Sequence, residues 1–226
     1  LTATTAPATL ILTPSTGMLA AGTYTATLAV ASPVAANTPQ TVSVTFTVTA
    51  APPAAPSNLT ATAVSPTQIN YAWTDNASNE DGFYVERCTG EGCTNFAFYG
   101  DALANATSLQ DPGLTAGTSY SYRVRAFNAG GVSAYSNAVT ATTLARLQVT
   151  AVGEGAVTSD PVGINCGGGG PACLFDFPGG AVVTLSATAA TGWQFLGWTG
   201  ACTGSGACQV AMTGNRGVAA GFGELP

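Results

Sequence analysis

Six cysteines carry the most reactive side chains in the sequence. They fall into three close pairs: Cys88 with Cys93, Cys166 with Cys173, and Cys202 with Cys208. A zinc site is the competing interpretation, but structural zinc sites commonly combine closely spaced Cys pairs with His. The last two pairs are spaced more widely than that pattern, and the sequence has no His. We therefore predict three local disulfides, each stabilising by about 2–3 kcal/mol, no metal, and a location outside the cytosol.

Acid–base catalysis in this chain would have to rest on carboxylates, because the sequence contains neither His nor Lys. His is the usual base near neutral pH and Lys the usual Schiff-base amine. Four acids lie close together in the middle of the chain: Asp75, Glu80, Asp81 and Glu86. A carboxylate pair for hydrolysis and a Ca²⁺ site are both conceivable, yet the D-x-[DN]-x-[DN]-G spacing is not met. Turn chemistry and ion pairs on strand faces explain these acids better, so we predict no catalytic residue and no cofactor.

Aromatic residues and a glycine run offer the remaining candidates for ligand binding. The glycines at 167–170 lie between two cysteines and lack the Lys of a phosphate-binding loop, so we expect a disulfide loop there. Trp73, and Trp198 with its glycine neighbours, are expected in the core. Trp193 is the better candidate for an exposed ring that stacks on a sugar.

The elements that position these residues are predicted to be strands throughout. Thr, Val, Ala and Gly dominate, and Thr and Val favour pleated, half-buried strands. No long stretch has apolar residues at helical spacing, so the fold class is all-β. The net charge of −6 and the absence of a basic patch exclude nucleic acid as a partner, and no run of apolar residues is long enough for membrane insertion.

Two joints divide the chain into tandem small β domains at 1–51, 52–144 and 145–226. The first joint, at 50–56, is Pro-rich and predicts an extended, semi-rigid spacer. Residues 1–74 carry no charge. Their Thr-rich surface is either a solvated hydroxyl face or a face covered by a partner, a neighbouring protomer or O-linked sugar.

The first domain alternates as strands do over 8–13, 22–31 and 41–49. The segments at 19–24 and 37–42 resemble the C-terminal half of BACON and related Ig-like domains of bacterial surface proteins. An Ig-like sandwich takes about 7 strands, so this part holds only a partial domain. We expect upstream domains or other protomers of the same protein to complete it, and completion by another protomer would build a filament.

The middle domain resembles a bacterial fibronectin type III domain over residues 55–143. The resemblance rests on the segments at 55–61, 69–73, 79–87 and 114–120, the last of which contains a tyrosine corner at Tyr120. It implies a seven-stranded sandwich in which Tyr120, Tyr122, Val124 and Ala126 share one face. The Cys88–Cys93 pair departs from the simplest family pattern and suggests a staple across a loop.

The last domain resembles the divergent internalin-type B-repeat domains of secreted and surface proteins. The signature runs through the segments at 153–159, 163–166, 180–187, 195–202 and 218–222. The resemblance implies a small, β-grasp-like module with an adhesive or structural role.

These features together predict a non-catalytic, extracellular structural or adhesion scaffold of a bacterial cell-surface or secreted protein. A sharper hypothesis makes the chain the subunit of an extracellular filament. The alternative is a carbohydrate-binding accessory region of a larger secreted enzyme, with cell-surface polysaccharide as its partner.

Overall fold

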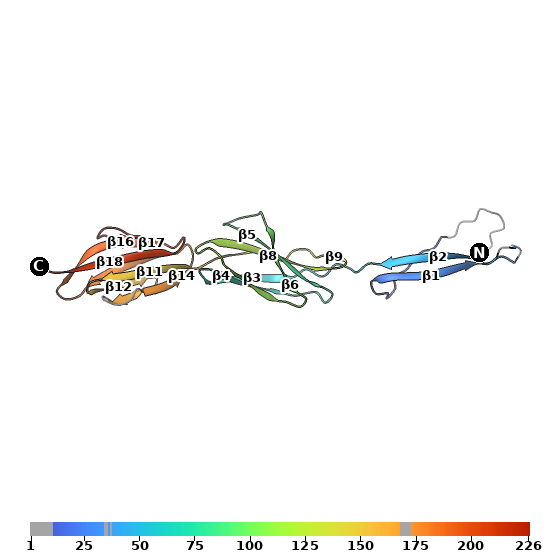
Figure 1. Ribbon diagram of the computed structural model, residues 1–226, viewed down its shortest axis with the longest axis horizontal. Helices are drawn as coiled ribbons and strands as arrows, with labels where there is room; N and C mark the ends of the chain where they lie inside the picture. The colour runs from blue at the N-terminus through green and yellow to red at the C-terminus, as the bar shows by residue number, and fades with distance from the viewer. Residues whose placement is uncertain (1–10, 34–35, 37, 168–172) are drawn as a thin grey trace.

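The computed structural model describes residues 11–33, 36, 38–167 and 173–226. Its β-structured parts follow one another along one long axis, a two-stranded hairpin first and two sandwich domains after it (Figure 1). No helix occurs among the described residues, and so none of them forms a helix that could cross a bilayer. The all-β prediction is confirmed.

The hairpin pairs β1 (Gly22–Val30) with β2 (Gln40–Val48) in antiparallel register. Because Tyr24 pairs with Phe46 and Leu28 with Val42, the apolar side chains of both strands share one face. The opposite face carries Thr, Ser and Ala only. No residue of either strand is buried.

The two hairpin strands agree with the predictions for 22–31 and 41–49, but the prediction for 8–13 is wrong at Ile11–Thr13. These residues belong to no strand, and Ile11 is 81% exposed. Residues 8–10 lie outside the described part of the chain. An alternating pattern becomes a strand only when a neighbour pairs with its backbone groups, and the hairpin offers Ile11–Thr13 no such pairing here.

The middle domain is a sandwich of two antiparallel sheets. One sheet has the order β3 (Ser57–Ser65), β4 (Gln68–Thr74), β7 (Ser108–Pro112). The other has the order β10 (Val139–Thr142), β8 (Ser119–Asn128), β5 (Gly82–Thr89), β6 (Ala97–Leu103), with β9 (Gly131–Val132) also pairing with β8.

The core of the middle domain follows the alternation seen in the sequence. Tyr120, Tyr122, Val124 and Ala126 all point from β8 into the core, as predicted, and Trp73 is buried opposite them. The hydroxyl oxygen of Tyr120 accepts a hydrogen bond from the backbone N–H of Thr115 at 3.1 Å. This bond forms the expected tyrosine corner.

The last domain encloses a second core between two four-stranded sheets. One sheet contains β14 (Cys173–Phe177), β11 (Ala145–Val152), β18 (Arg216–Glu224) and β16 (Trp193–Gly200). The other contains β13 (Asn165–Gly167), β12 (Gly155–Asp160), β15 (Val182–Ala189) and β17 (Cys208–Ala211). The predicted β-grasp-like fold needs refinement. Its parallel neighbours are present as β11 and β18. The core, however, is covered by a second sheet, and no described residue of this domain is helical.

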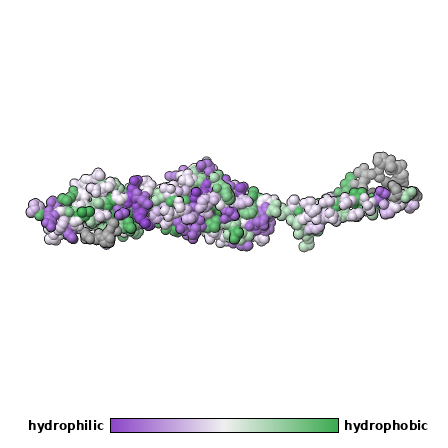
Figure 2. All heavy atoms as spheres, in the orientation of Figure 1, coloured by the Kyte–Doolittle hydropathy of each residue, from purple (hydrophilic) through white to green (hydrophobic). Residues whose placement is uncertain are grey.

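In the view of Figure 2, hydrophobic and hydrophilic residues are interspersed over the two sandwich domains, and neither shows a broad hydrophobic face there. Large exposed apolar side chains are scattered over both sandwiches, among them Phe98, Leu103, Val162 and Leu196.

Candidate functional site

The four acids considered as a catalytic pair do not face one another across a cleft. A carboxylate oxygen of Asp75 accepts the backbone N–H of Ala77 at 3.0 Å and so closes an Asx turn. Glu80 accepts the backbone N–H of Asn105 at 3.0 Å. Glu86 alone lies within a dense polar network, and its partners are cationic or phenolic.

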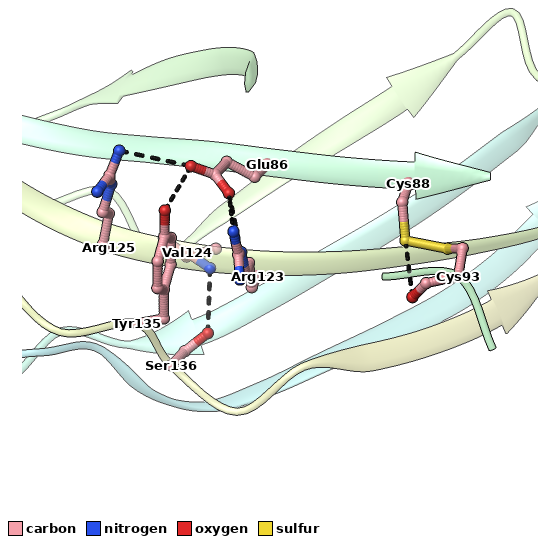
Figure 3. A network of polar contacts seen from close by, with 8 residues as sticks. All are labelled: Glu86, Cys88, Cys93, Arg123, Val124, Arg125, Tyr135 and Ser136. Carbon is pink, nitrogen blue, oxygen red and sulfur yellow. Dashed lines mark hydrogen bonds and ion pairs between the residues drawn. A yellow bond between two sulfur atoms is a disulfide. The ribbon is translucent and has the colours of Figure 1, made fainter. Parts of the chain in front are cut away.

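The Glu86 network lies on the outer face of the β5–β8 sheet (Figure 3). Oε2 accepts from Nε and Nη2 of Arg123 at 2.8 and 2.5 Å, while Oε1 accepts from the hydroxyl of Tyr135 at 2.5 Å and lies 3.4 Å from Nη2 of Arg125. Burial alone would raise the pKa of Glu86. The hydrogen bonds from Tyr135 and Arg123 and the charges of both arginines outweigh burial, so the pKa lies below its ordinary value.

Aromatic rings line up on both sides of this network. The Arg123 guanidinium lies 3.9 Å from the Tyr135 ring centre and 4.5 Å from that of Phe96. The rings of Tyr84 and Phe127 stack face to face with centres 4.0 Å apart. Each of these rings therefore makes a cation–π or ring contact within the domain, and these contacts stabilise the sheet.

A second network is centred on Asp111, whose side chain is fully buried. Its carboxylate accepts two hydrogen bonds from Nη1 of Arg87, at 2.8 and 2.9 Å, and one each from the hydroxyls of Tyr99 and Tyr122, at 2.5 and 2.8 Å. Burial, followed by the bond to Asp111 and its charge, raises the pKa of Tyr99 to about 12. Because Asp111 is on β7 and its partners are on β5, β6 and β8, the network ties the two sheets together.

All six cysteines are paired in disulfides. Cys88–Cys93, Cys166–Cys173 and Cys202–Cys208 each close a short loop. Of the predicted glycine loop, Gly167 ends β13, and residues 168–170 lie outside the described part of the chain. No group of His, Cys, Asp or Glu that could hold a metal ion occurs among the residues that the structure describes.

Comparison with known proteins identifies both sandwich domains. Residues 54–142 match the family model of the fibronectin type III domain, and residues 145–225 match that of the divergent InlB B-repeat domain. The chain therefore carries a fibronectin type III domain followed by a B-repeat domain. Both resemblances predicted from the sequence are confirmed, whereas the BACON-like character of the first domain stays a prediction.

Two curated bacterial proteins share part of this chain. Exoglucanase B of Cellulomonas fimi is 42% identical over 113 residues, which cover 47% of this chain and 9% of that protein. An alpha-amylase of Niallia circulans is 37% identical over 103 residues, or 43% of this chain and 7% of that protein. The chain thus spans under a tenth of the length of either relative.

Solved structures that are similar to part of this chain include titin kinase with its flanking domains, at 27% identity and a TM-score of 0.37. That match covers 42% of this chain and 18% of the titin chain. The FN5 domain of Drosophila Lar matches at 24% identity with a TM-score of 0.33, covering 40% of this chain and 96% of the Lar domain.

The joint between the fibronectin type III and B-repeat domains is short and buried. Only Thr143 and Leu144 separate β10 from β11, and Thr143 is fully buried. Its hydroxyl donates to the carbonyl oxygen of Thr115 at 2.7 Å and accepts from the backbone N–H of Thr118 at 3.0 Å. The backbone N–H of Gly117 in turn donates to the carbonyl oxygen of Leu144 at 3.2 Å.

Glycines let the two domains approach backbone to backbone at this joint. A Cβ on Gly117, where φ is +65°, would lie 2.5 Å from the carbonyl carbon of Thr213 in the B-repeat domain. A Cβ on Gly179 would lie 2.4 Å from the carbonyl oxygen of Thr143. Real Cβ atoms do not come this close, so neither position has room for a side chain.

The Pro-rich spacer on the other side of the fibronectin type III domain is also anchored. The carbonyl oxygen of Ala51 accepts from the side-chain amides of Asn79 and Asn128, at 3.1 and 2.9 Å. A Cβ on Gly130 would lie 2.0 Å from the carbonyl oxygen of Ala50. The expected semi-rigid spacer is thus bound to the domain at its N-terminal end, through Ala50 and Ala51.

The two tryptophans of the B-repeat domain differ in their surroundings. Trp198 is 4% exposed, and its indole N–H donates to the carbonyl oxygen of Gly206 at 3.0 Å, in agreement with the predicted core position. Trp193 is half-buried against the same core. Its role as a sugar-stacking residue stays a prediction.

Proposed function

We propose that this chain is a rigid, non-catalytic segment of a larger extracellular bacterial protein, in which it holds neighbouring domains at a fixed distance and direction. The observation that carries this proposal is the joint at Thr143. A flexible linker would leave its polar groups to water, whereas the hydroxyl of Thr143 both donates and accepts a hydrogen bond within the fibronectin type III domain. Gly117 and Gly179 bring the backbones of the two domains together and leave no room for side chains. Relative motion of two domains is the default expectation unless their interface constrains them.

Two lines of support favour an extracellular, polysaccharide-related setting. Three disulfides persist in oxidising compartments. The two curated relatives are named as an exoglucanase and an alpha-amylase. Of the roles expected from the sequence, an accessory region of a secreted carbohydrate-active enzyme therefore has more support than an adhesion scaffold, and a rigid spacer serves either role.

Small-angle X-ray scattering on the full chain tests the rigid joint. The matched control carries a Gly-Ser-Gly insertion after Leu144, between the last strand of one domain and the first strand of the next, and its thermal melt verifies that both domains remain folded. We expect the native chain to fit one fixed arrangement of the two domains and the insertion variant to require an ensemble. Scattering curves that require the same ensemble for both proteins would reject the proposal.

A second proposal concerns the hairpin, because no side chain of its two strands is buried and nothing in the described part of the chain pairs with either strand beyond the hairpin itself. Two-stranded hairpins are marginal in water, and a third strand or a packed layer is needed for independent stability. We propose that strands from upstream domains or from another protomer complete it by β-augmentation. Negative-stain microscopy over a concentration series distinguishes these sources: filaments support another protomer, and monodisperse particles at the highest concentration reject that source.

A further inference from the structure

One face of the β1–β2 hairpin is a ladder of hydroxyl groups. Three successive cross-strand pairs on this face carry a hydroxyl on both strands, and a fourth pair carries one on β2 only. The pairs are Thr23–Thr47, Thr25–Thr45, Thr27–Ser43 and Ala29–Thr41. All seven hydroxyl-bearing residues are exposed. Side chains on one face of a strand recur every second residue, about 6.6–6.8 Å apart, so the hydroxyls form two parallel rows.

The side-chain hydroxyls of this ladder are not engaged within the described part of the chain. The fibronectin type III domain provides the contrast, because it holds two cross-strand hydroxyl pairs on β8 and β10, Ser119–Thr142 and Ser121–Thr140. The hydroxyls of these pairs hydrogen-bond to each other at 2.8 and 2.6 Å. In the ladder, no side-chain hydroxyl forms a hydrogen bond with a described residue. Its hydroxyl oxygens are therefore both accessible and available for reaction.

The ladder lies in the part of the sequence that has no charged residue. Residues 1–74 carry none, whereas residues 75–125 carry ten of the sixteen charges. Exposed β surfaces normally carry charged side chains, which oppose association between copies, and the hairpin lacks this protection. Residues 1–50 instead hold 14 Thr, 3 Ser and 4 Pro, and a composition rich in Thr, Ser and Pro is typical of O-glycosylated segments.

We propose that the hydroxyl ladder is an acceptor site for O-linked neutral sugars. The donor is an activated glycosyl phosphate, and a glycosyltransferase of the bacterium that makes the protein catalyses the transfer. The side-chain oxygen of Thr or Ser forms a bond to the anomeric carbon of the sugar, while the bond from this carbon to the donor phosphate breaks. The phosphate leaves with the electron pair of that bond, and the hydroxyl proton passes to a base of the transferase. Nothing is oxidised or reduced.

Sugars on this face leave the other surfaces of the hairpin open. Tyr24, Leu28 and Phe46 lie on the opposite face, and a further strand would add at the outer edge of β1 or β2. Sugars on the ladder would therefore stop a second sheet from stacking on the hydroxyl face while a layer can still pack on the apolar face. The inference depends neither on the rigid joint nor on the source of the strands that complete the hairpin.

Mass spectrometry of the protein isolated from the bacterium that makes it tests the proposal. The matched reference is the same chain produced in a laboratory host without O-glycosylation, which should have the mass of the sequence. We expect the native protein to be heavier by whole hexose increments, and electron-transfer fragmentation to place the added mass on residues of the ladder. Alkaline β-elimination should remove the increments, because it cleaves sugars from Thr and Ser oxygens.

Two double variants made in the native bacterium test the acceptor residues. Thr25→Val with Thr45→Val removes one cross-strand hydroxyl pair and keeps β-favouring side chains, so the increments carried by this pair should be lost. Ser119→Ala with Thr142→Val is the matched control, because it removes a pair whose hydroxyls are bonded to each other, and it should keep all of the added mass. A native protein with the mass of the sequence, or added mass found only outside the ladder, would overturn the proposal.

Discussion

Gly117 of the fibronectin type III domain and Gly179 of the B-repeat domain meet backbone to backbone. A Cβ on Gly179 would lie 3.2 Å from the Cα of Gly117 and closer still to Thr142 and Thr143. Neither domain could reach this position if its partner carried a side chain there. The lack of a side chain at Gly117 in one domain and at Gly179 in the other therefore sets how the two domains are placed relative to each other.

Gly179→Ala should loosen the joint. The added methyl group would meet the carbonyl oxygen of Thr143 at 2.4 Å, and overpacking of this kind costs about 1–3 kcal/mol. We expect faster amide exchange at Thr143 and Leu144 and a broader distribution of shapes in scattering. Gly214→Ala is the control, because its Cβ would approach nothing nearer than the carbonyl oxygen of Ala116 at 3.9 Å. Equal behaviour of the two variants would contradict the role of close packing.

Tyr71 and Tyr122 offer a matched pair for measuring one buried hydrogen bond. Their rings stack with centres 4.8 Å apart, and both are buried. The hydroxyl of Tyr122 donates to Asp111, whereas that of Tyr71 is buried with no partner. Tyr122→Phe should lower the free energy of unfolding by about 1.5–3 kcal/mol, because it removes a bond to a buried carboxylate. Tyr71→Phe should leave it unchanged or raise it, and urea denaturation that ranks the variants in the opposite order would refute this account.

The sequence predicted what depends on local periodicity. The resemblance to a fibronectin type III domain placed Tyr122 and Val124 on one face of a strand, and the spacing of the cysteines predicted all three disulfides. The Asp111 network was not predicted, because the partners of Asp111 come from three other strands. No local sequence pattern distinguishes an acid that links two sheets from an acid in a turn. The close approach at Gly117 and Gly179 was not predicted for the same reason, since the residues that leave no room for a side chain at each glycine belong mainly to the other domain.

The failed strand at 11–13 shows the opposite limit. Its alternating pattern is compatible with a strand, but such a pattern indicates only what a segment can form when a partner strand is present. The sequence did not predict the exposure of the Phe98 side chain, because exposure on an edge strand depends on how β5 and β6 pair. Sequence patterns thus located the domains better than the surfaces through which they act.

Glu86 should make the fibronectin type III domain acid-sensitive. Its pKa is lower in the folded domain than in the unfolded chain, so its contribution is fully present above the unfolded value of about 4.3 and is lost as the pH falls through the lower, folded value. Glu86→Gln should lower stability by about 1–3 kcal/mol at pH 7 and flatten the dependence on pH below about 4.3. Denaturation midpoints between neutral and acidic pH measure both effects. Asp176→Asn, which breaks the exposed bridge to Arg146, should change little.

All six cysteines should be inert to alkylation in the native protein and become reactive after reduction. Each bridge closes a short loop, with a sequence separation of 5 to 7 between its cysteines, and its removal should cost about 2 kcal/mol in the chain-entropy model. Mass spectrometry after iodoacetamide treatment, with and without reductant, counts the free thiols, and thermal melts of the same samples measure the loss. Alkylation of the unreduced protein would instead show free thiols and support the interpretation as a zinc site.

The hairpin should contribute almost nothing to the stability of this chain on its own. Its two strands bury no residue, although Tyr24 and Phe46 pair on the apolar face. We expect backbone amides of β1 and β2 to exchange with solvent many orders of magnitude faster than those of β8, whose inward side chains are buried. Tyr24→Ser and Phe46→Ser should leave the main thermal transition in place, whereas Val124→Ser should lower it. Slow exchange in β1 at low protein concentration would show that the hairpin is already covered, and slow exchange that appears only at high concentration would identify a second copy of the chain as its cover.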